Sequence, residues 1–260
     1  MGQDFHHGYA DYPIYAFSKN YPHGHVEDWH HHQRIQLIHT LTGVLRVQTE
    51  HGIWICPPGR GVWIPAHQPH ALLISGQVKV RGVLIEPLSR ADLVDECLVV
   101  SISPLIRELM SAALEIQTAV LPHSRNERLL ELILDEVRWL PTLPFNLPEP
   151  KTPSLVQFCQ HVREHLAEAW PLDAAAAQLH MSSKTLARYF QKETGMNFAQ
   201  WIRQAKLMQA MTDLALNKPI LSIALDLGYE SPSAFSAMFK RETTMTPSEY
   251  IAQFEIMNRP

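Results

Sequence analysis

Residues 182–195 read SSKTLARYFQKETG, and a related stretch, SPSAFSAMFKRETT, stands 49 positions further on at residues 231–244. Matched serine, phenylalanine, glutamate and threonine residues make the two stretches an internal repeat. Each copy has a serine followed by two apolar residues spaced four apart: Ser182 with Leu186 and Phe190, and Ser231 with Phe235 and Phe239. Serine is a favoured N-cap residue, and apolar residues four apart lie on one face of a helix. The repeat therefore predicts two capped, amphipathic helices.

A short helix is predicted before each copy, at residues 172–179 (LDAAAAQL) and 221–227 (LSIALDL). A turn of about three residues separates each short helix from the capped helix that follows. Helix, tight turn and capped helix is the helix-turn-helix arrangement, in which the second helix lies in the major groove of DNA. We therefore predict two helix-turn-helix units, at residues 172–193 and 221–242.

The segment between the two units, residues 197–216, is predicted to be one continuous helix. Its apolar residues follow helical spacing, and Asn217 follows as a stop signal. Such a helix is about 30 Å long, because each residue adds about 1.5 Å. This length is close to the roughly 34 Å between successive major-groove faces of B-DNA. The two capped helices are therefore expected to enter adjacent major grooves.

Residues 153–250 closely resemble the DNA-binding domain of AraC/XylS-family bacterial transcription regulators. The most specific run is IALDLGYESPSAFSAMFKRETTMTPSEY, at residues 223–250. The resemblance implies a sequence-specific DNA-binding regulator, not an enzyme, with double-stranded DNA as its partner. Two positions depart from the family pattern: Thr244 replaces a helix-ending glycine, and Ile251 replaces a frequent arginine. These departures predict a looser helix end and the loss of one phosphate contact.

The same resemblance points one face of each capped helix toward DNA. The candidate residues of the first helix are Ser182, Lys184, Ala187, Arg188 and Gln191, and those of the second are Ser233, Ser236, Ala237 and Lys240. We expect Arg188 to read guanine, Gln191 to read adenine or bind phosphate, and the small second face to meet thymine methyls and backbone. Sequence discrimination is therefore expected mainly from the first helix. The alternative is an ordinary solvated helix face.

Composition and charge indicate a soluble globular protein and argue against a protein that coats nucleic acid indiscriminately. The chain has 46% hydrophobic residues and a net charge of −4. Residues 1–150 carry 11 basic and 16 acidic residues, whereas residues 151–260 carry 11 and 10. DNA affinity is therefore expected to depend on a few local contacts.

The cysteines and the hydropathy pattern favour a reducing, cytoplasmic location. Cys56, Cys97 and Cys159 are scattered and lack CxxC spacing, so neither a disulfide framework nor a zinc knuckle is indicated. The sequence contains no signal-peptide pattern and no apolar run of about 18 residues, so no membrane partner is expected.

Short β-like runs separated by turn residues extend from Tyr9 to about Pro87. The runs are IQLIHTL, GVLRVQTE, GIWICPP, GVWIPA, HALLIS and VKVRGVLIEP, and glycines such as Gly43 and Gly76 separate them. This pattern is typical of a small antiparallel barrel or jelly roll. The predicted fold class is therefore α+β: an N-terminal β-barrel with a helical pair, followed by an all-α domain with two helix-turn-helix units.

This β-rich stretch is similar to a cupin, the sensor domain of one branch of the AraC family. The matching positions are His30, His32, Gln36 and Gly43 in a first motif, and Gly59, Pro65 and His70 in a second. In metal-binding cupins such positions supply three imidazoles and a carboxylate, but Gln36 replaces the carboxylate here.

Two interpretations of His30, His32, Gln36 and His70 therefore remain open. They form an effector pocket lined by hydrogen-bonding histidines, or they bind a divalent metal. The alternative function is accordingly a metal-dependent cupin enzyme or metal sensor fused to a DNA-binding module.

Two helices are predicted after the barrel, at residues 103–117 and 124–140. Ser103 and Ser124 are the expected caps, the second with a Ser124/Glu127 capping box. The apolar face of the second helix is wider than covering a barrel requires. Because regulators of the family that the chain resembles often pair through helices at this place, we expect a homodimer formed through this pair, and the alternative is simple packing on the barrel.

The expected domains are a cupin-like sensor (1–98), the helical pair (99–140), a stiff proline-rich linker (141–153) and the DNA-binding domain (154–260). The linker contains five prolines in thirteen residues, PTLPFNLPEPKTP, which block helix formation. The first helix of the DNA-binding domain is predicted to begin with Thr152 and Pro153 and to end at Trp170. Besides DNA, the expected partners are a small-molecule effector, a second copy of the chain and RNA polymerase.

Overall fold

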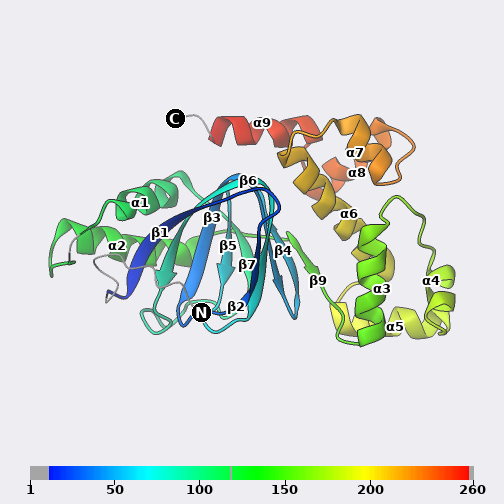
Figure 1. Cartoon of the computed structure of the whole chain (residues 1–260), viewed down its shortest axis with the longest axis horizontal. Coiled ribbons are helices and arrows are strands. Elements are labelled where there is room, and N and C mark those ends of the chain that lie inside the picture. The colour runs from blue at the N-terminus through cyan, green and yellow to red at the C-terminus, as the bar shows by residue number, and fades with distance from the viewer. Residues whose placement is uncertain (1–11, 118, 258–260) are drawn as a thin grey trace. The chain divides into compact units, whose positions relative to one another are not determined.

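The computed structural model describes residues 12–117 and 119–257 of the chain (Figure 1). Residues 9–11 of the predicted strand series and residues 258–260 of the predicted DNA-binding domain lie outside these ranges. The described residues form two compact units. One contains residues up to 49 together with 54–145, and the other contains residues 50–53 together with those from 146 onward.

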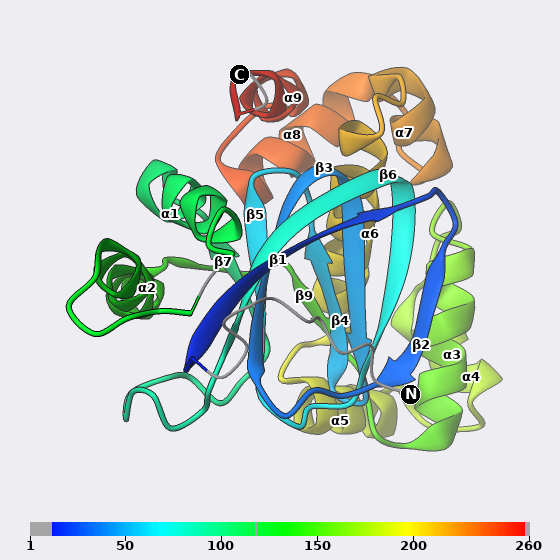
Figure 2. The same ribbon diagram turned by 60° about the vertical axis from the view of Figure 1, so that its left-hand side comes forward.

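The first unit is built on a strongly curved, barrel-like sheet (Figure 2). Its main path has the order β1-β6-β3-β5-β7-β8, with β2 paired to β6 and β4 paired to β3. The first two residues of β4 and the whole of β9 belong to the second unit. The strands have these bounds: β1 (Ile14–Tyr21), β2 (Val26–His30), β3 (Ile35–Thr49), β4 (Gly52–Cys56), β5 (Arg60–Ile64), β6 (His70–Ile85), β7 (Leu98–Ser101), β8 (Thr142–Leu143) and β9 (Asn146–Pro148). The second unit is mostly helical, which confirms the predicted α+β fold class.

Two pairs of predicted strands are in fact single long strands. The first two runs merge into β3, and the last two merge into β6. Gly43 and Gly76 were expected to end strands, but they lie inside β3 and β6 with φ of 65° and 79°. At Gly43 an added Cβ would lie 2.6 Å from Val78 Cγ2, so only glycine fits. The pairing of β3 with β6 shifts register just before Gly43, so this glycine marks a β-bulge rather than a turn.

Two helices, α1 (Pro104–Leu114) and α2 (Arg125–Glu136), pack together against β1 and are followed by a short 3-10 helix, η1 (Val137–Trp139) (Figures 1 and 2). Ser103 caps α1 and Ser124 caps α2, as predicted. The carboxylate of Glu127, however, accepts from the backbone N–H of His123 at 2.5 Å rather than from Ser124.

The apolar face of α2 is buried inside its own unit. The five residues on which the predicted excess width rested join the core formed with α1 and the sheet: Leu129, Leu130, Ile133, Leu134 and Val137. Covering the sheet therefore uses this whole face, and the width of the face is no longer an argument for dimerisation.

The second unit contains the helices α3 (Pro153–Glu164), α4 (Leu172–Gln178), α5 (Ser183–Thr194), α6 (Phe198–Ala215), α7 (Ile220–Asp226), α8 (Pro232–Thr243) and α9 (Pro247–Met257). Helix α3 ends at Glu164 and not at Trp170 as predicted. The indole N–H of Trp170 instead folds back and donates to the carbonyl of His165 at 3.0 Å. No helix of the described residues is both long and apolar enough to cross a membrane.

The proline-rich segment 141–153 is more than the bare connector that its composition predicts. Strand β8 pairs with β7 in the first unit, and the residues from 146 onward belong to the second unit. There Trp201 Nε1 donates to the carbonyl of Pro148 at 2.8 Å, and Gln204 Nε2 donates to that of Asn146 at 3.0 Å. Carbonyls accept hydrogen bonds even where proline removes donors, so a proline-rich chain can still be fixed in place.

Candidate nucleic-acid interface

Helix α5 is capped and packed as the first copy of the repeat predicts. The hydroxyl of Ser182 accepts from the N–H of Thr185 at 3.2 Å. On the inner face Leu186 and Phe190 are fully buried. The Phe190 ring meets Trp201 of α6 edge-on, with 5.8 Å between ring centroids. This aromatic contact orients α5 and leaves its opposite face toward solvent.

Helix α8 repeats this construction. The hydroxyl of Ser231 accepts from the N–H of Ala234 at 3.2 Å, and Phe239 packs edge-on against Tyr250 of α9 with centroids 5.3 Å apart. Near the helix end the hydroxyl of Thr243 donates to the carbonyl of Phe239 at 2.8 Å. Thr194 makes the matching 2.7 Å bond in α5. The repeat in sequence is therefore also a repeat in structure.

The two turns differ in length by one residue. After α4 the N–H of Met181 donates to the carbonyl of Ala176 at 2.9 Å, and after α7 the N–H of Tyr229 donates to that of Ala224 at 2.8 Å. These equivalent bonds lie 48 positions apart, whereas the caps Ser182 and Ser231 lie 49 apart. The second turn therefore carries one additional residue before its capped helix.

Helix α6 joins the first helix-turn-helix unit to the second as a single rod of 18 residues. Asn197 and Gln200 form a reciprocal capping box at its start. At about 1.5 Å per residue the rod is about 27 Å long. Ten residues of α6 are buried, among them Trp201, so this helix also contributes to the core of the second, helical unit of the chain.

The outer face of α5 carries the candidate base-contacting residues of the first copy. Lys184, Arg188 and Gln191 are exposed, and Ala187 is half-buried. Ser182 is exposed, but its hydroxyl is used for the cap. Gln191 is also engaged, because its Nε2 donates to the carbonyl of Gly195 at 2.9 Å.

The outer face of α8 carries smaller side chains. Ser233, Ala237 and Lys240 are exposed, and Ser236 is half-buried. Thr244 occupies the left-handed region with φ of 67°, as Gly195 does at the end of α5 with φ of 72°. The N–H of Thr244 still donates to the carbonyl of Lys240 at 2.8 Å, so the predicted looser helix end is not found. A β-branched residue in this conformation is strained instead.

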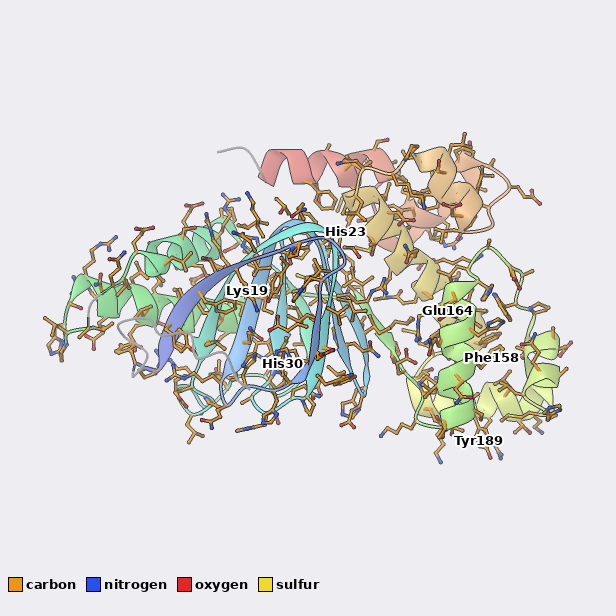
Figure 3. All side chains as sticks on the ribbon, viewed as in Figure 1. Lys19, His23, His30, Phe158, Glu164 and Tyr189 are labelled. Carbon is orange, nitrogen blue, oxygen red and sulfur yellow. The ribbon has the colours of Figure 1, made fainter. Side chains whose placement is uncertain are left out.

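In the first unit, which is built on the sheet and is called the sheet unit below, the structure brings together three of the four predicted pocket residues. One ring nitrogen from each of His30, His32 and His70 lies within 4.8 Å of the others. His30, labelled in Figure 3, is the last residue of β2. Burial lowers the pKa of His32 and of His70 to about 4, so both rings are neutral at pH 7. Gln36 is buried on β3, and its Oε1 has no hydrogen-bond partner among the described residues.

Comparison with known proteins identifies both halves of the chain. A helix-turn-helix domain model matches residues 175–253, and an AraC-like ligand-binding domain model matches residues 12–133. The HTH-type transcriptional regulator NimR of Escherichia coli K12 is 32% identical over 224 residues, which cover 86% of this chain and 82% of NimR. The chain belongs to the AraC family of transcription regulators.

Other matches are partial or distant. SoxS of Salmonella typhimurium is 37% identical over 90 residues, covering 34% of this AraC-family chain and 84% of SoxS. The solved structure of ToxT from Vibrio cholerae covers 93% of this chain and 98% of ToxT, with 11% identity and a TM-score of 0.39. The AraC-family chain is thus a DNA-binding transcription regulator with a ligand-binding domain, and not an enzyme, as predicted.

Two polar contacts within the helical unit of this AraC-family chain were not predicted. Lys206 of α6 donates to the carbonyl of Leu227 at 2.7 Å and lies 5.3 Å from the ring centroid of Tyr229. Glu193 of α5 accepts from the N–H groups of Lys151 and Thr152 at 2.8 and 2.9 Å. The shared Glu193 and Glu242 of the repeat were visible in the sequence, but only the fold shows which backbone groups Glu193 meets.

Proposed function

We propose that the chain binds one operator through two recognition helices, α5 and α8, placed in adjacent major grooves. The observation that carries this proposal is their shared construction. Both are capped by serine, anchored by a buried phenylalanine and open to solvent on the opposite face, and one rod joins them. Because α6 is about 27 Å long, the separation that it provides is close to the roughly 34 Å spacing of groove faces.

In this scheme α5 supplies most of the base discrimination. The guanidinium of Arg188 is exposed, 5.3 Å from the ring centroid of Tyr189. It suits a bidentate contact with guanine O6 and N7. Gln191 reads adenine or binds phosphate after its bond to Gly195 is exchanged for one to DNA. Lys184 and Ala187 complete the face, and Ser182 lies at its N-terminal end, where helix N–H groups favour phosphate.

Helix α8 contributes mainly position and backbone affinity. Ser233, Ser236 and Ala237 are small and uncharged, so they suit thymine methyls and close backbone approach. Lys240 is exposed at the last turn and suits a phosphate. The sequence preference at this half of the operator is therefore weaker than at the half bound by α5.

Selection from a random DNA library, followed by hydroxyl-radical footprinting of the selected operator, tests this arrangement. The expected pattern has two protected segments about one helical turn, or roughly 10 base pairs, apart. Protection of a single segment, or none, would contradict the use of both helices.

We further propose that the chain is a cytoplasmic regulator whose DNA binding responds to an effector. Residues 1–98 sense a small molecule, residues 99–140 pair two copies, residues 141–153 link the domains, and residues 154–260 bind DNA. Effector binding changes DNA affinity only to the extent that the effector prefers one state of the protein. RNA polymerase is the further partner through which bound protein alters transcription.

For dimerisation the support is the set of apolar residues of the helical pair that remain exposed. Leu105, Leu132 and Trp139 are 47%, 40% and 76% exposed. Light scattering of the full chain at micromolar concentration is expected to give a dimer. Trp139→Ser together with Leu132→Ser is expected to give a monomer of unchanged helicity, whereas a wild-type monomer would contradict the proposal.

A further inference from the structure

The histidine cluster of the sheet unit, formed by His30, His32 and His70, has a defined tautomeric state at two of its rings. The Nδ1 of His30 lies 2.7 Å from the carbonyl of Asp28, and the Nδ1 of His70 lies 2.8 Å from that of Gln68. A carbonyl only accepts, so each Nδ1 carries the proton. The Nε2 of both rings therefore has a free lone pair. Carbonyls that hold the second nitrogen in this way typically orient histidine ligands of metals.

One of these lone pairs is buried without a protein partner. His70 is only 1% exposed, and its Nε2 has no hydrogen-bond partner among the described residues. A buried polar atom without a partner is unfavourable, because it has lost its hydrogen bonds to water. Its position beside two further imidazoles, with ring centroids 4.3 Å from His30 and 5.5 Å from His32, makes a bound cation a natural way to satisfy it.

The chemistry of the cluster selects the class of ion. Glu27 is the acidic residue whose charge acts on these rings, but its carboxylate already accepts from Lys19 at 3.1 Å and from Tyr21 at 2.9 Å. The cluster therefore offers imidazole nitrogens without a free carboxylate. Imidazole suits zinc, copper, nickel and iron, whereas magnesium, calcium and manganese favour oxygen ligands.

We propose that His30, His32 and His70 bind one divalent transition-metal ion inside the ligand-binding domain. Zinc is the ion with which the proposal is tested. Three protein ligands leave at least one coordination position for water or for a donor atom of the effector. This inference concerns the sensor alone and does not depend on the DNA contacts proposed above.

A second histidine cluster supplies an internal control. His161, Glu164 and His165 of α3 also have ligand atoms within 4.8 Å of one another, and Glu164 is labelled in Figure 3. This group is more open, since His161 and Glu164 are exposed, and Gln160 donates to the Glu164 carboxylate at 3.0 Å. Weak metal uptake there would be independent of the site in the sheet unit.

The test uses the full chain without a histidine tag, freed of metal by chelation. Cobalt binding is followed by its visible absorption, and zinc binding by competition with the cobalt signal and by the thermal midpoint. The expected result is one tightly bound ion per chain and a rise in the midpoint. His30→Gln is expected to weaken binding by about 10-fold to 100-fold or more and to remove the rise.

The double variant His161→Gln with His165→Gln is expected to bind this ion like the wild type. Far-UV circular dichroism and selected-operator binding of the metal-free variants establish that both remain folded and bind DNA. The proposal is overturned if the wild type binds no stoichiometric ion, if His30→Gln binds as tightly as the wild type, or if only the α3 variant loses binding. Each of these outcomes leaves the DNA-binding proposal standing, because footprinting tests it separately.

Discussion

The carboxylate of Glu193 in α5 holds Thr152, accepting from its backbone N–H at 2.9 Å and from its hydroxyl at 2.6 Å. Thr152 is the N-cap residue of α3, but its own side chain caps no N–H of that helix. The last turn of α5 thereby fixes the segment that leads into the helical unit. Burial tends to raise the pKa of Glu193, but the hydrogen bonds from Thr152 and Lys151 outweigh this and lower it.

Glu193→Ala is expected to destabilise the DNA-binding domain by about 1 kcal/mol, because it leaves the N–H groups of Lys151 and Thr152 without this acceptor. Glu242→Ala is the matched control, since Glu242 occupies the same position in the second copy and pairs only with the neighbouring Arg241 among the contacts described. Chemical denaturation measures both variants. Equal losses would contradict the assigned role of Glu193.

Thr244→Gly is expected to stabilise the chain by about 1 kcal/mol, because glycine adopts a positive φ without the strain that threonine carries there. Gly195→Thr is the reciprocal variant. An added Cβ at Gly195 would meet nothing within 4 Å, so its cost reports the backbone conformation alone. We expect thermal midpoints to move in opposite directions, and a shift of the same sign would refute the explanation.

Arg188→Ala is expected to cost about 1 to 3 kcal/mol of DNA-binding free energy on the selected operator and to relax its preference at one position. Binding titrations against single-base variants of the operator measure this. Arg125→Ala removes the same charge from the exposed start of α2 and serves as the control. If both variants lose affinity equally, Arg188 acts only through net charge.

Lys240→Ala is expected to weaken binding to selected and scrambled DNA alike and to lower the salt slope by about one. The reason is that a phosphate contact carries no base information. Titrations at several salt concentrations measure the slope. A loss confined to the selected operator would show that Lys240 reads a base.

Stability is expected to fall as the pH falls from about 6.5 toward 4, partly through His39. Burial, followed by the charges of Arg107 and Arg81, lowers the pKa of His39 from 6.5 to about 4. Between these values the unfolded chain binds a proton that the folded chain does not, so protonation favours unfolding, by up to about 3 kcal/mol at the acid end. His39→Gln is expected to flatten the dependence measured by denaturation of the metal-free chain. An unchanged slope would contradict this origin.

The sequence predicted best what depends on local spacing. The caps Ser182 and Ser231, the continuous helix α6 and the β-rich first unit all follow from patterns within about 20 residues. Predictions were poorest where a distant contact decides the local structure. Gly43 lies at a bulge where Val78 leaves no room for a Cβ, and the wide apolar face of α2 packs in the core with α1 and the sheet.

In the candidate sites, too, local spacing could be predicted from the sequence, whereas distant contacts could not. Cupin-like spacing brought His30, His32 and His70 together correctly, because residues at the ends of neighbouring strands meet in the sheet. The tautomers of His30 and His70 could not be predicted, since they depend on the carbonyls of Asp28 and Gln68. Similarly, spacing placed Gln191 on the outer face of α5, but not its bond to Gly195.

If α5 and α8 both contact DNA as proposed, the difference between the charged face of α5 and the small, nearly neutral face of α8 gives the bound protein a direction. Lys184 and Arg188 would mark one end of the operator, while Ser233 and Ala237 would tolerate many sequences at the other. Inverting such an operator would turn the regulator head to tail relative to the transcription start. A promoter under its control should therefore respond to the orientation of its binding site as well as to the site's presence.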